Sequence, residues 1–268
     1  MALVATGLNK TFSTGKVAAN GVSLRVAAGD FVAVVGESGS GKSTAARMML
    51  KLITPDAGIV SWNGVDVAGM SKAAEKAFRS KVQVVFQDPS GALNPRKRIR
   101  TILGEVTKFY GIATTPDAID AHSRDMLERV GLTPADTYMN RFPHELSGGQ
   151  RQRILIARAM IPKPEIIIAD EAVSALDVSV KAGVLRLMED LRQKEGVGYL
   201  LISHDLPVVR KVATYVYVMR NGEVVEEGAT ADIFERPQQP YTRELLGAAV
   251  DLDTVLAERM AKRHAVSA

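Results

Sequence analysis

Hydrophobic and polar residues alternate over residues 2–30, and turn-forming residues interrupt the alternation at positions 14–15 and 28–30. A period of two is typical of strands that bury one face. Residues 31–35 are all apolar and rich in β-branched side chains, as expected of a buried strand. Residues 44–52 contain neither glycine nor proline, which favours a helix. The pattern therefore predicts short antiparallel strands, then a buried strand that leads into a helix.

Strands and helices also alternate in the rest of the chain. The apolar runs at residues 166–169 and 199–202 fit buried parallel strands. Between them, one apolar helical stripe is formed by Val184, Leu187, Met188 and Leu191. Further strands are expected within residues 59–67, 81–86 and 216–225. The first and last of these segments contain an Asn-Gly pair and are interpreted as hairpins. This alternation predicts an α/β fold with a central, mainly parallel sheet behind an N-terminal antiparallel β subdomain.

The pattern changes between about residues 91 and 162, where long segments have helical spacing and β-branched runs are few. We expect an inserted helical subdomain there, with helices near 118–130 and 149–160. Residues 142–146 are expected to be extended. A basic cluster opens this subdomain and is either solvated surface or a contact for an anionic or protein partner. Its members are Arg96, Lys97, Arg98 and Arg100.

Composition narrows the function classes. A chain of 268 residues, 46% of them hydrophobic, can form one large domain or one domain with an inserted lobe. The net charge of +4 is too small to predict nucleic-acid binding, so we expect no nucleic-acid partner. The absence of cysteine excludes disulfides, thiolate metal sites and cysteine nucleophiles. No apolar run approaches membrane-spanning length, and the N-terminus lacks the pattern of a signal peptide.

Residues 36–43 match the pattern of a phosphate-binding loop, and they lie between a predicted strand and a predicted helix as this motif requires. Glycine permits backbone angles that turn N–H groups toward phosphates, and the helix N-terminus adds partial positive charge. Lys42 can reach the β- and γ-phosphates, and the Ser43 hydroxyl can bind Mg²⁺. The predicted nucleotide-binding residues are Gly36, Glu37, Ser38, Gly39, Ser40, Gly41, Lys42, Ser43 and Thr44.

Polar residues follow several predicted strands, at the sheet edge where α/β proteins build their sites. Asp170 can hold Mg²⁺, and the adjacent Glu171 can act as a general base toward an attacking water. Gln87 can contact both the metal and the water, so it is a candidate metal ligand and catalytic residue. His204 can donate an N–H to the γ-phosphate, although a lone histidine is more often structural. Phe12 is either an adenine-stacking ring or a core residue.

A second anion-binding cap is predicted where a hydroxyl and two glycines open a helix, at Ser147, Gly148, Gly149 and Gln150. One chain does not need two caps for the same phosphates, so the sequence indicates two chains that share two nucleotides. Together with the phosphate loop, Gln87, residues 170–171, residues 174–177 and His204, this cap makes the chain resemble the ATP-binding subunit of an ABC transporter. The resemblance extends over nearly the whole sequence.

The resemblance implies a P-loop NTPase core, with an ATP-binding domain over residues 2–250, its helical subdomain at about 91–162, and a tail over 251–268. ATP and Mg²⁺ are the implied cofactors. Lys42 would serve the phosphates, Glu171 would be the base and His204 the γ-phosphate switch, whereas Gln87 would sense both the γ-phosphate and the transmembrane partner. The cap at 147–150 would complete the neighbouring subunit's site, with Asp177 coupling the two sites. Phe12 occupies the place of the family's adenine-stacking aromatic.

Residues 86–89, 93–96 and 233–242 resemble the subgroup that energises the uptake of dipeptides, oligopeptides and nickel. The implied partners are a second ATPase subunit, identical or related, transmembrane permease subunits and, indirectly, a solute-binding protein. The implied location is the cytoplasmic face of the cell membrane, as a peripheral subunit. The chain departs from the family at Ala172-Val173, where Pro-Thr is usual, which puts the turn before Asp177 in doubt. Lacking cysteine, it cannot carry the iron–sulfur centre of some relatives.

Two other functions use part of the same motifs. A soluble ABC-type ATPase of a non-transport complex, such as one for phosphonate degradation, would share all the core motifs. A small-molecule P-loop kinase would explain the loop at residues 36–43 but neither the cap at 147–150 nor His204. The transported solute is not readable from this chain, because specificity would reside in the permease and the solute-binding protein.

Overall fold

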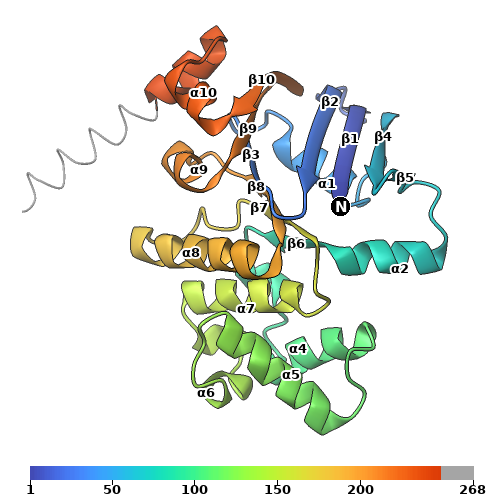
Figure 1. Cartoon of the computed structure of the whole chain (residues 1–268), viewed down its shortest axis with the longest axis vertical. Helices are drawn as coiled ribbons and strands as arrows, with labels where there is room; N and C mark the ends of the chain where they lie inside the picture. Colours follow the sequence, from blue (N-terminus) through green and yellow to red (C-terminus); the bar gives the residue numbers. More distant parts are fainter. Residues whose placement is uncertain (249–268) are drawn as a thin grey trace, which may run out of the picture.

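The structure is a computed structural model that describes residues 1–248, without the side chains of residues 89 and 90. In that part of the chain the strands form two sheets, one antiparallel and one mainly parallel (Figure 1). The predicted α/β fold class is confirmed, including the strand–loop–helix unit around residues 36–43. The predicted tail at 251–268 lies outside the described residues.

The antiparallel sheet has the strand order β2-β1-β4-β5. Its central strand β1 (Ala2–Thr11) pairs with β2 (Val17–Ala27) on one side and with β4 (Ala57–Trp62) on the other. An Asn-Gly pair with φ angles of 51° and 80° joins β4 to β5 (Val65–Asp66). These left-handed angles are the ones that a tight hairpin turn requires, so the predicted hairpin is confirmed.

The mainly parallel sheet has the strand order β10-β9-β3-β8-β7-β6, in which β9 and β10 are antiparallel and the other described pairs are parallel. Strands β3, β7 and β8 are buried along their whole length, as their continuous apolar sequences predict. The strands are β3 (Phe31–Val35), β6 (Val82–Phe86), β7 (Ile166–Asp170), β8 (Gly198–Ile202), β9 (Tyr215–Arg220) and β10 (Glu223–Ala229).

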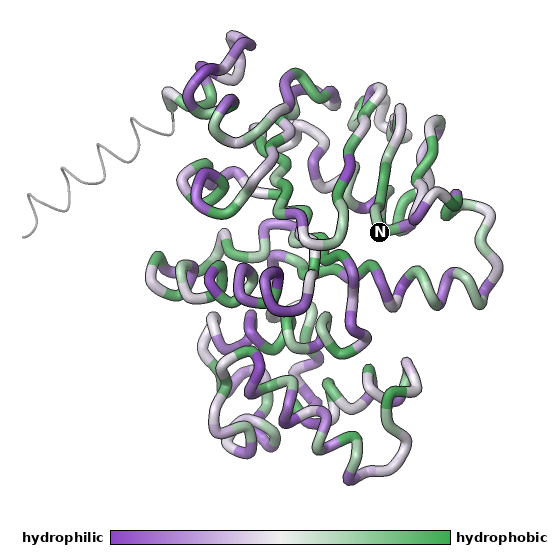
Figure 2. The backbone as a smooth tube through the Cα atoms, in the orientation of Figure 1, coloured by the Kyte–Doolittle hydropathy of each residue, from purple (hydrophilic) through white to green (hydrophobic). Residues whose placement is uncertain are grey.

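Alternate residues of the central strands enter two hydrophobic cores on opposite faces of the sheet. Phe31, Ala33 and Val35 join the core that includes the buried sides of α7 and α8. Val32 and Val34 join the other core, with α1 and the antiparallel sheet. Figure 2 shows hydrophobic residues gathered on these strands. Burial on both faces holds the central strands, and therefore the loops at their ends, in fixed positions.

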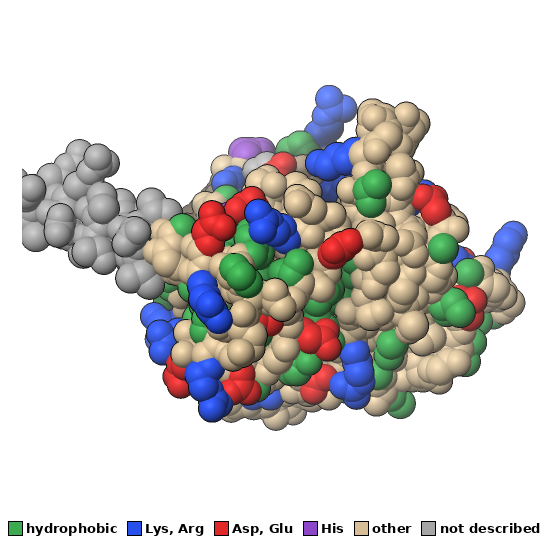
Figure 3. Space-filling model, turned by 90° about the horizontal axis from the view of Figure 1, so that it is seen from above, with side chains coloured by type: hydrophobic (Ala, Val, Ile, Leu, Met, Phe, Trp, Pro, Cys, Tyr) green, Lys and Arg blue, Asp and Glu red, His purple; other side chains and the backbone are tan. Residues whose placement is uncertain are grey.

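Several helices pack around the central sheet. The predicted apolar stripe of α8 is buried, as expected. The helices that flank the sheet are α1 (Lys42–Met49), α2 (Lys72–Lys81), α8 (Val178–Glu195), α9 (Leu206–Val212) and α10 (Thr230–Glu235), and residues 240–248 are also helical. In the space-filling view of Figure 3, basic and acidic side chains are interspersed on the face shown.

A helical region lies between β6 and β7, at the end of the molecule away from the antiparallel sheet (Figure 1). Its helices are α3 (Pro89–Ala92), α4 (Ile99–Phe109), α5 (Pro116–Arg129), α6 (Asp136–Met139) and α7 (Gly148–Met160). Part of the basic cluster is used inside this region, because Lys97 pairs with Glu105 and Arg100 pairs with Asp120. Those two cations are therefore paired surface residues.

Two local features differ from the sequence-based expectation. An extended segment is expected at 142–146, but Pro143–Glu145 forms a 3₁₀ turn, η1. The Glu145 carboxylate accepts the Phe142 backbone N–H at 2.6 Å, which closes the turn. Helix α2 is not expected from the sequence pattern; Ser71 caps it by accepting the Ala74 N–H. In both cases, one local side-chain hydrogen bond satisfies a backbone group at the start of the turn or helix.

Candidate functional site

The predicted phosphate loop, residues 36–43, connects the end of β3 to the start of α1. Gly36, Gly39 and Gly41 have φ angles of 145°, 83° and 106°. A Cβ on Gly36 would lie 2.1 Å from the Met219 carbonyl oxygen, and one on Gly41 would lie 2.2 Å from the Ala18 carbonyl oxygen. Backbone sterics therefore require glycine at both positions. Neighbouring strands hold the loop close against the sheet.

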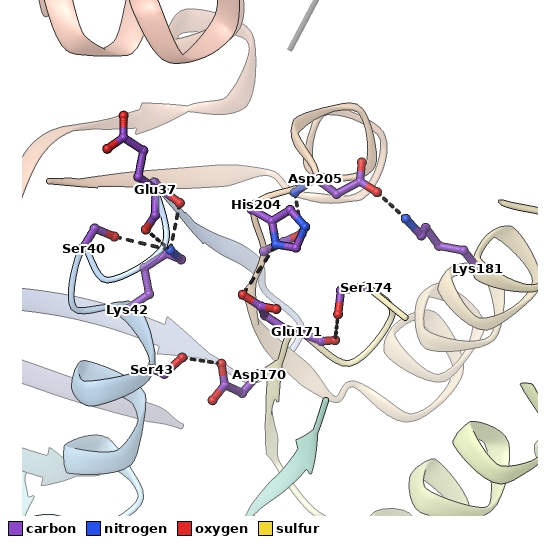
Figure 4. A network of polar contacts seen from close by, with 12 residues as sticks. Glu37, Ser40, Lys42, Ser43, Asp170, Glu171, Ser174, Lys181, His204 and Asp205 are labelled. Carbon is purple, nitrogen blue, oxygen red and sulfur yellow. Dashed lines mark hydrogen bonds and ion pairs between the residues drawn. The ribbon is translucent and has the colours of Figure 1, made fainter. Parts of the chain in front are cut away.

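The Lys42 ammonium is held by neutral oxygens of the same loop (Figure 4). Nζ donates to the Gly36 carbonyl at 2.8 Å, to the Glu37 carbonyl at 2.7 Å and to the Ser40 hydroxyl at 3.3 Å. Burial lowers the pKa of Lys42, and the nearby carboxylates of Glu171 and Asp170 oppose that shift. A buried ammonium with neutral partners is well placed to bind an anionic ligand that enters the loop.

Ser43 and Asp170 form a polar contact between the start of α1 and the end of β7. The Ser43 hydroxyl donates to the Asp170 carboxylate at 2.8 Å, and Asp170 ends β7. Burial raises the pKa of Asp170, whereas the hydrogen bond from Ser43 lowers it. Hydroxyl and carboxylate oxygens are the ligands that Mg²⁺ prefers. Within residues 1–248 no cluster of three acidic or histidine residues could hold a metal. Ser43 and Asp170 therefore offer two oxygen ligands to such an ion.

Glu171 and His204 face each other from the ends of two adjacent strands, β7 and β8. His204 Nδ1 lies 3.5 Å from Glu171 Oε1. Glu171 has a φ angle of 50°, which is uncommon for a residue with a side chain. Its backbone N–H donates to the Ile202 carbonyl at 3.0 Å, and the Ser174 hydroxyl donates to its carbonyl at 2.9 Å. These bonds hold the glutamate in a conformation that it would otherwise rarely adopt.

The turn after Glu171 contains the residues that depart from the family pattern. Ala172 and Val173 are both buried and belong to the core that includes α7 and α8. The Ser174 hydroxyl and backbone N–H both donate to the Glu171 carbonyl. The turn is thus closed by hydrogen bonding and anchored by apolar packing. Asp177 follows as the exposed N-cap position of α8, without a side-chain cap bond.

One cavity brings many of the predicted residues together. It is lined by Phe12, Lys16, Ala18, Ser38, Gly39, Gly41, Lys42, Ser43, Thr44 and Glu171. Phe12 is 38% exposed, so it is a ring at the cavity mouth and not a core residue. Lys16 is not predicted from the sequence, because a lone lysine after a turn carries no recognisable pattern. Placed here, it adds a second cation near the phosphate loop.

Asp205 is another residue that is not predicted from the sequence. Its carboxylate accepts the Val208 N–H at 3.1 Å as the cap of α9, and it also pairs with Lys181 of α8 (Figure 4). The sequence Asp-Leu-Pro, with proline near the start of the helix, is the signal that could have indicated this cap. Because Asp205 adjoins His204, this double anchoring fixes the backbone that carries the histidine.

The remaining predicted residues lie outside the cavity. Ser147 caps α7, where its hydroxyl accepts the Gln150 N–H and its own N–H donates to the Gln150 side chain. A Cβ on Gly149 would lie 2.3 Å from Val180, so this glycine lets α7 and α8 pack closely. Gln87 is exposed just after β6. Ser147 and Gln87 are not among the residues that line the cavity in the described chain. One chain therefore presents the loop and the cap on separate surfaces.

Comparisons with known proteins agree with this arrangement. A family model described as ABC transporter matches residues 19–174. BOV_A0347 of Brucella ovis is 48% identical over 227 residues. It is provisionally named as a peptide import ATP-binding protein. The alignment covers 85% of this chain and 71% of that protein. The peptidoglycan transport ATP-binding protein YejF of Agrobacterium fabrum is 46% identical over 238 residues, which cover 89% of this chain and 43% of YejF.

Longer relatives and solved structures extend the comparison. The glutathione import ATP-binding protein GsiA of Shigella dysenteriae is 45% identical over 85% of this chain, which spans 36% of GsiA. The chain thus spans less than half the length of YejF and GsiA.

A dimeric, post-hydrolysis structure of the ATP-binding cassette MJ0796 with ADP and Pi has a TM-score of 0.75 and 27% identity. It aligns with 85% of this chain and 98% of MJ0796. The cbiO1 structure from Clostridium perfringens, at 24% identity and a TM-score of 0.77, shares the fold.

Proposed function

Because the chain belongs to the ABC transporter family of ATP-binding proteins, we propose that it is the ATP-binding and ATP-hydrolysing subunit of an importer. One observation carries the proposal: the phosphate loop, Glu171 and the ring of Phe12 line one cavity, whereas Ser147 caps a helix elsewhere. In the proposed assembly, a second cassette would supply its Ser147 cap to this cavity. The solved dimer of MJ0796 supports such pairing. We propose that the partner is a second copy or a related ATPase subunit.

The transported solutes that we propose are dipeptides or oligopeptides. Three relatives support this class of solute, because their names refer to peptide import, peptidoglycan transport and glutathione import. Each of the named substances is a peptide or contains one.

The proposed partners are transmembrane permease subunits and, through them, a solute-binding protein. None of the helices in residues 1–248 combines the length and the hydrophobicity that a membrane crossing requires. We place the subunit at the cytoplasmic face of the membrane, with residues 2–250 as the ATP-binding domain and 91–162 as its helical subdomain.

In this mechanism the chain binds ATP through the backbone N–H groups of the phosphate loop and the Lys42 ammonium. Ser43 and Asp170 would hold Mg²⁺, whose charge would stabilise the phosphate oxygens. Phe12 would stack on adenine. Residues 147–150 of the partner would contact the γ-phosphate from the other side, with Asp177 near the junction. Since those contacts exist only in the closed dimer, ATP stabilises that state and loss of the γ-phosphate releases it.

Hydrolysis needs a base and a donor near the γ-phosphate. Glu171 lines the cavity and would accept a proton from the attacking water, while its backbone is fixed by Ile202 and Ser174. His204, 3.5 Å from Glu171, would donate an N–H to the γ-phosphate. Gln87, exposed after β6, would contact the metal and the water, and would transmit the change to the permease.

Changing Lys42 to Ala should weaken ATP binding by about 10- to 150-fold, because hydrogen bonds from charged groups contribute roughly 1.5–3 kcal/mol. The ammonium is buried within the loop, where it donates to the Gly36 and Glu37 carbonyls. Isothermal titration of ATP into the purified variant measures the effect. Lys72→Ala, an exposed lysine of α2, is the matched control and should bind ATP normally. Equal affinities for both variants would contradict the loop assignment.

Purification of the tagged chain from detergent-solubilised membranes tests the proposed function. We expect permease subunits to copurify, and the complex to hydrolyse ATP faster when a peptide-loaded binding protein is present. Copurification with soluble enzymes instead would favour the non-transport ATPase. Phosphoryl transfer to an added small-molecule acceptor, with little hydrolysis in its absence, would favour a kinase.

A further inference from the structure

The helical segment at residues 240–248 contacts the phosphate loop although it lies far along the chain. Tyr241 and Thr242 are 4% and 1% exposed, whereas Arg243 and Glu244 on the same turn are exposed. Residues 240–242 also stand out in the sequence, and neither the binding nor the hydrolysis of ATP described above uses them. The burial of Tyr241 and Thr242 indicates that this segment makes a specific contact with the rest of the domain.

Tyr241 contacts the phosphate loop directly. The Glu37 backbone N–H donates to the Tyr241 hydroxyl oxygen at 3.2 Å, across 204 positions of sequence. On the other side, the Arg220 guanidinium lies 4.6 Å from the centroid of the Tyr241 ring. Arg220 ends β9 directly after Met219, whose carbonyl abuts Gly36. The ring is therefore held between the end of β9 and the loop.

The contact acts on the same peptide group that holds Lys42. The Gly36 carbonyl and the Glu37 N–H belong to one planar peptide unit. The carbonyl accepts from the Lys42 ammonium at 2.8 Å, and the N–H donates to Tyr241 at 3.2 Å. Since the two groups point in opposite directions, bonds at both ends fix the rotation of the plane. Without the hydroxyl, only the lysine end would be held.

We propose that Tyr241 is a positioning residue for the phosphate loop, through which the helical segment at 240–248 sets the affinity for ATP. The part that concerns affinity rests on the proposed function; the part that concerns loop geometry does not. Tyr241 would orient the Gly36–Glu37 peptide so that Lys42 is presented toward the phosphates. A conformational or binding event that pulls this segment away would then weaken ATP binding without touching the site itself.

Tyr241→Phe tests the proposal, because it removes the hydroxyl and keeps the ring over which Arg220 lies. Tyr217→Phe is a closely matched control. The Tyr217 hydroxyl, on a side chain 7% exposed, also accepts a backbone N–H at 3.2 Å, from Arg25. Arg25 lies in β2, away from the phosphate loop. Both variants lose one buried hydroxyl and leave one backbone donor without that acceptor, so a purely structural role would affect them alike.

Two measurements follow. Amide hydrogen exchange of the nucleotide-free proteins should show faster exchange in the peptide that contains Glu37 in Y241F, and no change there in Y217F. Titration should show an ATP Kd raised about 5- to 30-fold in Y241F, because the loss of one hydrogen bond lets the Gly36–Glu37 peptide turn away from the orientation that presents Lys42 to the phosphates. In Y217F the Kd should change less than about 2-fold, because the bond that is lost there is at Arg25 and not at the loop. The kcat at saturating ATP should remain within about 2-fold of wild type, which a general loss of structure would not produce.

Each outcome has one meaning. Unchanged exchange at Glu37 in Y241F, or equal ATP affinities for the two variants, would overturn the proposal. If Y241F does not purify folded, Arg220→Ala carries the same test, because it removes the group that holds the ring and leaves the hydroxyl. It should also speed exchange at Glu37, and unchanged exchange would overturn the proposal. If wild type itself binds no ATP, the proposed function fails, and the exchange experiment still decides the positioning role.

Discussion

Glu171→Gln should lower the turnover number for ATP by about 10²- to 10⁴-fold, the usual contribution of a general base, while ATP binding persists. The amide has the size of the carboxylate but cannot accept a proton from water. The backbone bonds to Ile202 and Ser174 do not involve the side chain and remain in the variant. The loop contacts of Lys42 also remain, so the variant should bind ATP and stay closed around it.

Steady-state phosphate release and ATP titration measure these two effects separately. Glu235→Gln is the control, since Glu235 is an exposed carboxylate at the end of α10 and should not affect hydrolysis. Normal turnover in E171Q would show that another group is the base. Loss of ATP binding together with turnover would show that Glu171 acts on the shape of the site and not on the water.

Ser147→Arg should abolish most ATP hydrolysis while leaving ATP binding to the same chain unchanged. The reason is that Ser147 is exposed at the start of α7, and is absent from the residues that line the cavity beside Lys42. An arginine there would obstruct the partner's γ-phosphate site. We expect a fall of about 10²- to 10³-fold in turnover, as for removal of one preorganised donor from an active site.

A matched control separates this effect from the loss of a helix cap. Thr115 caps α5 in the same helical region by accepting the Ala118 N–H, so Thr115→Arg loses a comparable cap bond. That variant should hydrolyse ATP at close to the wild-type rate. The result that would count against a shared site is similar hydrolysis by S147R and wild type, or similar losses in S147R and T115R.

The sequence predicts the parts of the site that depend on local pattern. The strand before Gly36 is a continuous apolar run, and buried strands of this kind are recognised from such runs. Asp170 and Glu171 follow another such run, so their place at the sheet edge follows from the residue pattern alone. The closeness of Ser43 to Asp170, 127 positions apart, is also inferable, because both motifs end or follow parallel strands.

Other contacts could not be predicted, because they join segments that share no local pattern. The bond from Glu37 to Tyr241 spans 204 positions and depends on how the C-terminal helical segment packs. Lys16 reaches the cavity only because β2 folds back beside the loop. The turn η1 depends on one hydrogen bond, from the Phe142 N–H to the Glu145 carboxylate. The spacing of apolar residues does not reveal a short-range bond of this kind.

In the proposed mechanism two cassettes close around ATP, with the loop of one facing the Ser147 cap of the other. Sedimentation velocity of E171Q, alone and with any cassette that copurifies, measures whether this pair forms. With Mg-ATP we expect the mass of two cassettes, and with ADP or in S147R-E171Q we expect the mass of one. A single-cassette mass in Mg-ATP, or a pair that forms equally well with the S147R change, would rule out a nucleotide site shared between two cassettes.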